Sequence, residues 1–151
     1  MFAYRLLLLM ALFLFSLSAC SNCDPGWTLF KGLCYTINDK SSWTNAEALC
    51  KQSNAHLISI HSNGEQAFAA SLAKEDYLFW TGGFVNMTQH RLDKYWSDGS
   101  SWDYNRFYRE DVRAGPTCLV SDVDTYTWEN FDCYYEFASI CKKRVNANIQ
   151  I

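Results

Sequence analysis

The longest apolar run of the chain lies at its start, where Leu6 to Leu17 are almost wholly apolar and follow the charged residue Arg5. The small residues Ser18 and Ala19 come next. A charged start, a short apolar core and a small-residue exit are typical of a secretory signal peptide. The run is also shorter than the roughly 20 apolar residues that a membrane span needs. The pattern therefore predicts a signal peptide over residues 1–20, cleaved at about positions 18–20, and no later run predicts a membrane span.

The next stretch changes from the pattern of a hairpin to the pattern of a helix. Trp27 to Ile37 is apolar and rich in β-forming residues, with Gly32 as a turn residue, which predicts a short hairpin. Ser41 or Ser42 can cap the segment that follows. In that segment residues recur at three- and four-residue spacing, which predicts an amphipathic helix with its apolar stripe facing a core. The residues at this spacing are Trp43, Ala46, Leu49, Cys50 and Ser53.

A short strand and a second helix are predicted next. Leu57 to Ile60 has the composition of a strand, and Ser62 and Glu65 fit a capping box that opens a helix extending to about Lys74. From Tyr77 to Cys141 the chain is rich in aromatic residues, Gly, Asp and Ser and shows no helical period, which predicts short strands and long loops. Two helices followed by a loop-rich β half predict an α+β domain.

Charge and length narrow the possible partners. Without the signal peptide about 130 residues remain, the size of one domain. The chain has 13 Lys and Arg against 16 Asp and Glu, and the loss of Arg5 leaves 12 against 16, a net charge of −4. We find no lysine or arginine cluster and so predict no nucleic-acid partner. The acidic balance also argues against an acidic partner held by charge alone.

The cysteines predict a disulfide framework. Seven are present, at positions 20, 23, 34, 50, 118, 133 and 141, and export implies an oxidising compartment. The odd one is Cys20, in the cleavage region. The stretch Leu17-Ser18-Ala19-Cys20 also resembles a bacterial lipoprotein processing box, which is an alternative to ordinary cleavage. Spacing alone does not choose among the 15 pairings that the other six cysteines allow.

Three aromatic motifs and the cysteine positions together resemble the C-type lectin-like domain. Trp80-Thr81-Gly82-Gly83 stands where that family has Trp-Ile-Gly-Leu. Trp96 to Phe107 follows the family pattern Trp-x-Asp-Gly-Ser…Trp-x-x-x-Asn, with Phe107 where a tryptophan is usual, and Trp128 to Cys133 resembles its Trp-Asn-Asp strand. The resemblance covers residues 21–145, leaving a tail at 146–151. It implies two helices packed on short antiparallel sheets, with a long loop region that presents the binding surface.

The resemblance also implies the disulfides and the role of the tryptophans. In the long form of the domain the pairs are Cys23–Cys34, Cys50–Cys141 and Cys118–Cys133. A link that closes a loop of about 15 residues, such as the last pair, contributes roughly 3 kcal/mol in the chain-entropy model. Such links allow a domain to carry a long irregular loop region. We expect Trp80, Trp96 and Trp128 to be core residues rather than ligand contacts.

The calcium site of sugar-binding members is incomplete in this sequence. Calcium takes six to eight oxygen ligands. The resemblance implies donors from an acceptor-Pro-acceptor tripeptide, from a glutamate two residues before Cys118, and from the Trp-Asn-Asp strand. Here the only proline of the loop is Pro116, which lacks such donors and itself occupies the glutamate position. Only Glu129 and Asn130 remain, in reversed order, so we expect no metal and no cofactor. If calcium is bound, Glu129 and Asn130 are its candidate ligands.

Other carboxylates near the loop have competing roles. Asp122 and Asp124 are expected to form the turn of the Cys118–Cys133 hairpin. Glu110 and Asp111 alternate with arginines that would pair with them. The long loop is rich in tyrosine and arginine, the residue types enriched at interface hot spots. An ordinary solvated loop is the alternative. The candidate ligand-binding residues are Arg106, Tyr108, Arg109, Glu110, Asp111, Glu129 and Asn130.

No catalytic motif is found. The chain has no G-x-S-x-G and no H-E-x-x-H pattern. His56, His61 and His90 have no distinctive spacing to a nucleophile, and a catalytic histidine needs an orienting partner. An enzyme would require a cleft that holds a histidine with a paired serine or carboxylate. Asn86-Met87-Thr88 is a sequon, which predicts N-glycosylation at Asn86 in a eukaryotic secretory pathway.

Taken together, the sequence predicts a secreted, extracellular C-type lectin-like recognition protein without enzymatic activity. Its partner would be a glycan or an extracellular protein, bound without the usual calcium site. A calcium-dependent carbohydrate-binding lectin with a rearranged site is the alternative, and a secreted hydrolase is a weaker third hypothesis.

Overall fold

The computed structural model describes residues 23–88, 91–107 and 115–145. The predicted signal peptide, Cys20 and the tail at 146–151 lie outside these residues, as do Tyr108, Arg109, Glu110 and Asp111 of the long loop. The described chain is α+β, as predicted. Its elements are β1 (Thr28–Phe30), β2 (Leu33–Ser41), α2 (Trp43–Gln52), β3 (His56–Leu57), α3 (Asn63–Leu72), β4 (Leu78–Met87), β5 (Leu92–Trp96), β6 (Gly115–Asp122), β7 (Trp128–Phe131) and β8 (Phe137–Arg144).

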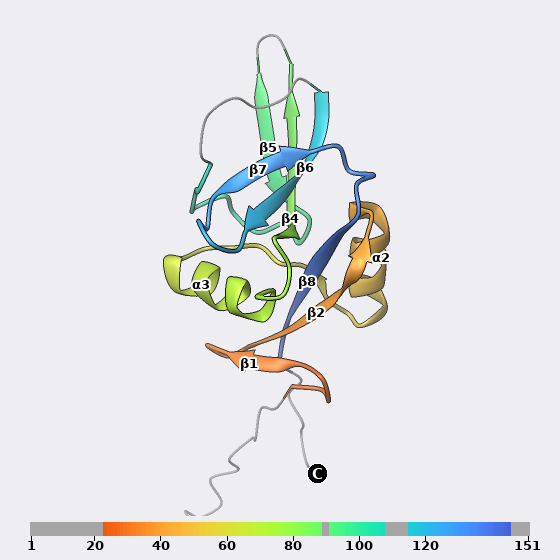
Figure 1. Cartoon of the computed structure of the whole chain (residues 1–151), viewed down its shortest axis with the longest axis vertical. Helices are drawn as coiled ribbons and strands as arrows, with labels where there is room; N and C mark the ends of the chain where they lie inside the picture. The colour runs from red at the N-terminus through yellow and green to blue at the C-terminus, as the bar shows by residue number, and fades with distance from the viewer. Residues whose placement is uncertain (1–22, 89–90, 108–114, 146–151) are drawn as a thin grey trace, which may run out of the picture.

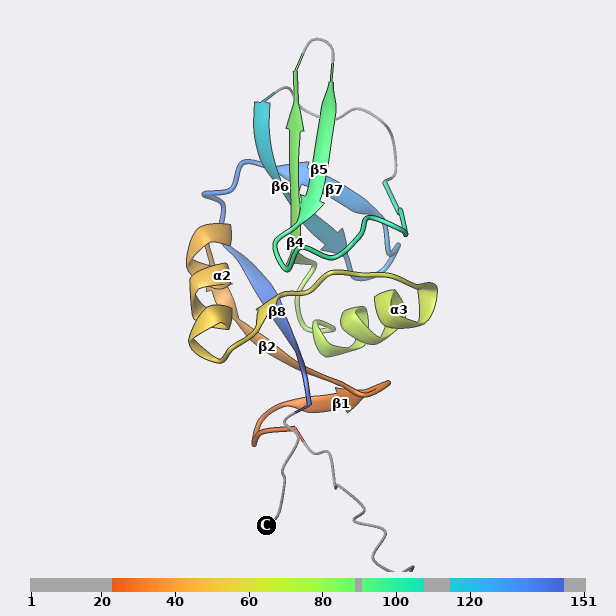
Figure 2. The same ribbon diagram turned by 180° about the vertical axis from the view of Figure 1, so that it is seen from behind.

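The strands form one connected sheet that spreads from β8. Its order is β1-β2-β8-β4-β6-β7, with β3 also paired to β8 and β5 paired to β4. All pairs between these strands are antiparallel, in line with the expected antiparallel sheets, except β4–β8, which is parallel. Figures 1 and 2 both show β4 to β7 at one end of the molecule and β1, β2 and β8 towards the other, with α2 and α3 on opposite sides of β8.

The first helix begins where the sequence predicts but buries a different stripe. Ser42 is the N-cap, and its hydroxyl accepts a hydrogen bond from the backbone N–H of Asn45. Leu49 is 44% exposed, so its expected place in the core is wrong. The charged residue Glu47 is buried instead. Its Oε2 accepts hydrogen bonds from the backbone N–H of Leu57 and the hydroxyl of Ser97, which compensates for the loss of water.

The second helix, α3, has only one of the two hydrogen bonds expected of a capping box. The Ser62 hydroxyl accepts from the backbone N–H of Glu65, as expected. The Glu65 carboxylate, however, accepts from the backbone N–H of His61 rather than that of Ser62, and its other oxygen accepts from Tyr35 and Lys142. The helix ends at Leu72, two residues before the predicted end. The predicted strand over Leu57 to Ile60 is also shorter, because only His56–Leu57 pairs, with β8.

The aromatic motifs form the core. Trp80, Trp96 and Trp128 are at most 1% exposed, which confirms their expected role. The indole N–H of Trp128 donates to Gln66 Oε1 at 2.7 Å. Phe107 lies with its ring 6.1 Å from that of Trp128, so phenylalanine serves here in the packing role expected of the usual tryptophan.

Three disulfides join the elements, in the same pairs that the family resemblance implies. Cys23–Cys34 ties the start of the described chain to β2, Cys50–Cys141 ties α2 to β8, and Cys118–Cys133 ties β6 to the segment after β7. Two of the links are therefore anchored in the strand pair β2–β8, at the centre of the fold.

Two aspartates organise turns. Asp122 Oδ1 accepts from the backbone N–H groups of Asp124 and Thr125, as expected for a turn residue. Asp98, after β5, accepts from the hydroxyls of Ser59 and Ser100 and from the backbone N–H of Ser100. Burial raises the pKa of Asp98, but these hydrogen bonds and the Lys142 charge outweigh it and hold the pKa below its usual value. Asp98 thus connects the turn to the segment after β3.

Gly82→Ala should destabilise the fold by about 1–3 kcal/mol, because a Cβ at this position would lie 2.7 Å from the Leu57 carbonyl oxygen and from Ser97 Oγ. Gly64→Ala is the matched control. Its Cβ would approach only the flexible Lys31 Nζ, and alanine is the better helix former by up to about 1 kcal/mol. Urea unfolding of both variants tests the difference. Equal stability of the two variants would contradict this account of the glycine.

Asp98→Asn should lower the free energy of unfolding at pH 7 by about 1–3 kcal/mol, since the carboxylate accepts three hydrogen bonds. Because the folded-state pKa lies below the unfolded-state value of about 3.9, the carboxylate stabilises the fold at pH values above about 3.9. This stabilisation is lost as the pH falls through the folded-state pKa. The difference in the free energy of unfolding between wild type and Asp98→Asn should therefore shrink below about pH 4. Asp93→Asn, on the exposed hairpin pair with Arg91, should cost at most about 1 kcal/mol.

Candidate functional site

The long-loop face is only partly described. Arg106 is half-buried, and its Nε donates to the Tyr126 carbonyl at 3.2 Å. Its own carbonyl accepts from the backbone N–H of Trp128 at 2.8 Å. Arg106 therefore holds the base of the loop against β7. The other loop candidates, Tyr108, Arg109, Glu110 and Asp111, lie outside the described residues, so their place in a site stays a prediction.

Glu129 and Asn130 do not converge on one point. They are successive residues of β7, and successive strand side chains point to opposite faces. Glu129 is exposed, whereas Asn130 is buried and its Nδ2 donates to Thr117 Oγ1 at 2.9 Å. Among the described residues no group of three or more His, Cys, Asp or Glu side chains could hold a metal ion. The expectation of no bound calcium stays a prediction, because four loop candidates are not described.

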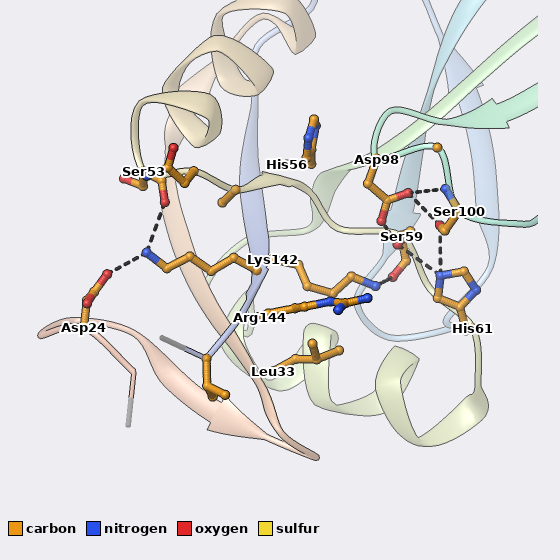
Figure 3. A pocket seen from close by; sticks show the side chains of 15 residues that line it. Asp24, Leu33, Ser53, His56, Ser59, His61, Asp98, Ser100, Lys142 and Arg144 are labelled. Carbon is orange, nitrogen blue, oxygen red and sulfur yellow. Dashed lines mark hydrogen bonds and ion pairs between the residues drawn. The ribbon is translucent and has the colours of Figure 1, made fainter. Parts of the chain in front are cut away.

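A cavity of about 950 Å³ lies elsewhere, where the end of α2, β3, the Asp98 turn and the end of β8 meet. Figure 3 shows its walls. Its lining comes from segments far apart in the sequence, and this cavity was not predicted from the sequence. The lining residues are Asp24, Leu33, Ser53, Asn54, Ala55, His56, Ser59, His61, Asp98, Gly99, Ser100, Lys142, Lys143, Arg144 and Val145.

His61 occupies one corner of the cavity with partners that the sequence did not reveal. Its Nδ1 lies 2.6 Å from Asp103 Oδ1, and its Nε2 lies 3.1 Å from Ser59 Oγ and 3.2 Å from Ser100 Oγ. The hydrogen bond from His61 lowers the pKa of Asp103. The serine–histidine–aspartate order has the outline of a nucleophile, a base and an orienting carboxylate. A cleft that holds a histidine with serine and carboxylate, the requirement for an enzyme, is thus present in outline.

The proton inventory of this corner argues against nucleophilic catalysis. The hydroxyls of Ser59 and Ser100 both donate to the Asp98 carboxylate, the second at 2.6 Å. A hydroxyl carries one proton, so in this arrangement neither serine donates to His61 Nε2. The serine protons point to Asp98 instead of to the imidazole. The corner is therefore arranged to hold hydrogen-bonding groups in place rather than to activate a serine.

Cations form another wall. Lys142 Nζ donates to the Ser59 carbonyl at 2.5 Å and to Glu65 Oε1 at 3.1 Å, and Lys143 Nζ donates to Asp24 Oδ2 at 2.6 Å. Arg144 is exposed, and its side chain has no hydrogen bond or ion pair within the described residues. In Figure 3 the side chains of Lys142 and Arg144 both run towards the corner of Ser59 and His61.

This basic wall corrects the prediction that the chain has no lysine or arginine cluster. Lys142, Lys143 and Arg144 are consecutive in the sequence, directly after Cys141. That run was the available signal for the cavity. Within the described part of the chain no helix has the length and apolar character needed to cross a membrane.

Known proteins resemble this chain over most of its length. The family model described as Lectin C-type domain matches residues 39–143. One chain of the snaclec agkisacutacin of Deinagkistrodon acutus is 32% identical over 144 residues, which cover 89% of this chain and 93% of the relative. One chain of the snaclec coagulation factor IX/factor X-binding protein of Protobothrops flavoviridis is 32% identical over 132 residues, with 81% and 85% covered.

A solved structure shows the same fold. A calcium-independent type II antifreeze protein superposes with a TM-score of 0.70 at 28% identity, covering 83% of this chain and 96% of that one. The cysteine pairs, the three buried tryptophans and these matches agree. The chain belongs to the C-type lectin domain family.

Proposed function

We propose that the protein is a secreted recognition protein that binds a carbohydrate or an extracellular protein without the calcium site usual in sugar-binding members. The observation that carries the proposal is the arrangement of Glu129 and Asn130. One of these side chains faces solvent, while the other is buried and donates to Thr117 Oγ1. A calcium ion needs six to eight oxygens arranged around it, and two residues on opposite faces of a strand do not begin such a shell.

The protein acts by binding rather than by catalysis. The hydroxyls of Ser59 and Ser100 donate their hydrogen bonds to the Asp98 carboxylate, which leaves His61 without a serine to activate. The weaker hydrolase alternative therefore finds no support in the cavity that comes closest to its requirements.

The names of the relatives support a protein ligand and binding without calcium. One snaclec is named for binding coagulation factors IX and X, and the antifreeze protein is named calcium-independent. A protein ligand would suit the tyrosines and arginines of the long loop, among them Arg106. A carbohydrate would suit a cavity lined by hydroxyls, imidazoles and charges.

Export fits the chemistry of the chain. Three disulfides are stable in an oxidising compartment, and the apolar start has the form of a signal peptide. Asn86 lies half-buried in β4, opposite Asp93 of β5, and Thr88 of its sequon is exposed. Glycosylation at Asn86 stays a prediction.

Calcium should not stabilise the protein. A weak extracellular site, with a Kd of about 10⁻⁴–10⁻³ M, would add about 1.4–2.7 kcal/mol at about 10 mM calcium and raise the Tm by several degrees. We expect the same Tm in calcium and in chelator, and the same Tm for Glu129→Gln. A rise in Tm with calcium that Glu129→Gln abolishes would favour the alternative of a rearranged calcium lectin.

The triple substitution Arg106→Ala, Tyr108→Ala and Arg109→Ala should weaken ligand binding about fivefold or more, as expected for hot-spot residues. A glycan array, run in calcium and in chelator, identifies the ligand, and a blank array directs the search to extracellular proteins. The control pair is Arg91→Ala and Tyr77→Ala, since these residues are exposed but lie outside the loop. Unchanged binding with an unchanged Tm would remove the loop from the site.

A further inference from the structure

The wall formed by the end of β8 is basic in a protein whose overall charge is acidic. Lys142 and Arg144 are two positions apart in β8, so their side chains leave the same face of the strand. Arg144 pairs in register with Leu33 of β2, at the rim of the cavity. With a net charge of −4 after loss of the signal peptide, the surface as a whole repels anions. A local excess of positive charge at the cavity therefore depends on how the cations of this wall are paired.

Of the three cations in this wall, Arg144 is the one whose side chain is not paired with a carboxylate among the described residues. Two carboxylates line the cavity, Asp24 and Asp98. Asp24 is paired with Lys143, and Asp98 accepts hydrogen bonds from two serines. Lys142 is paired with Glu65 behind the wall.

The Arg144 side chain has no partner among the described residues and can offer its full charge to a ligand. Clefts concentrate the field of such a charge, and a guanidinium recognises carboxylate, sulfate and phosphate in two-pronged geometry.

The remaining lining suits a ligand with many hydroxyls. Asn54 supplies an amide and Ser100 a hydroxyl, while His56 and His61 supply imidazoles. Apolar side chains are few: Leu33, Ala55 and Val145. A lipid or a flat apolar ligand would need a mainly hydrophobic pocket, whereas a saccharide presents donors and acceptors to groups of this kind. The cavity, at about 950 Å³, is at the upper end of the usual size for small-molecule sites.

We propose that this cavity binds an acidic saccharide, with Arg144 paired to the carboxylate or sulfate and the Asn54 and Ser100 side chains bonded to ring hydroxyls. The inference rests on the proposed function, a recognition protein without catalysis, and adds the class of ligand and the place where it binds. Asp98 fixes Ser100, and through it the position of His61, so these donors and acceptors are preorganised before the ligand arrives.

The test compares four probes by calorimetry with the purified full-length secreted protein. Sialyllactose carries a carboxylate and a chondroitin sulfate oligosaccharide carries sulfate, lactose is neutral, and a short polyglutamate peptide has charge without sugar. We expect at least one acidic saccharide to bind at least tenfold more tightly than lactose and polyglutamate. Arg144→Ala should weaken that binding about tenfold or more, and Arg144→Lys should restore part of it.

Arg91→Ala is the matched control, because Arg91 is exposed on the β4–β5 hairpin and should leave binding unchanged. Equal binding by Arg144→Ala and wild type would overturn the proposal, as would equal binding of polyglutamate or the absence of binding by both acidic saccharides. The proposed function has a separate outcome. Binding of a neutral glycan or a protein that depends on the long loop, and not on Arg144, would preserve that function and overturn the acidic-saccharide site.

Discussion

The arrangement of this domain depends on one buried carboxylate, that of Glu65 at the start of α3. It accepts hydrogen bonds from the Tyr35 hydroxyl, the Lys142 ammonium and the backbone N–H of His61, and so joins α3 to β2, to β8 and to the segment after β3. Burial raises the pKa of Tyr35, and the Glu65 charge raises it further, so Tyr35 remains a donor. A buried carboxylate without these partners would cost several kcal/mol. The same bonds place His61 and Lys142 at the edge of the cavity, which makes the geometry of the candidate site a product of the core.

Much of the fold could be predicted because its signals are local or belong to the motifs. The serine caps, the hairpin turn and the buried tryptophans were all visible in short stretches. The prediction failed where distant partners decide burial. Helical spacing assigned Leu49 to the core, but Glu47 is buried there because its Oε2 accepts from Leu57 and Ser97, which both lie outside the helix. Likewise, Glu65 bonds the N–H of His61 instead of the cap residue, because its other oxygen is already held by Tyr35 and Lys142.

The candidate site shows the same difference between features that local sequence predicts and features that depend on distant contacts. Comparing the chain with the family pattern was enough to question Glu129 and Asn130 as calcium ligands, because missing donors can be read from sequence. The cavity could not be found in this way, since it takes its lining from several separate segments. His61 had no visible partner until folding brought Asp103 and Ser100 to it. Even the resulting serine–histidine–aspartate order was not informative by itself. Its meaning depends on Asp98, which accepts the hydrogen bonds of both hydroxyls.

The disulfide arrangement also determines how the domain would respond to mechanical tension. A force applied between Cys23 and Val145 would pass through Cys23–Cys34 into β2, continue to Cys50, and cross by Cys50–Cys141 to the end of β8. The segment between Cys50 and Cys141, 91 positions apart, would carry none of it. That segment contains α3, the long loop and most of the cavity wall. The covalent path of such a force would thus bypass the long loop, whereas Lys142 and Arg144 lie on the stretch after Cys141 that carries it.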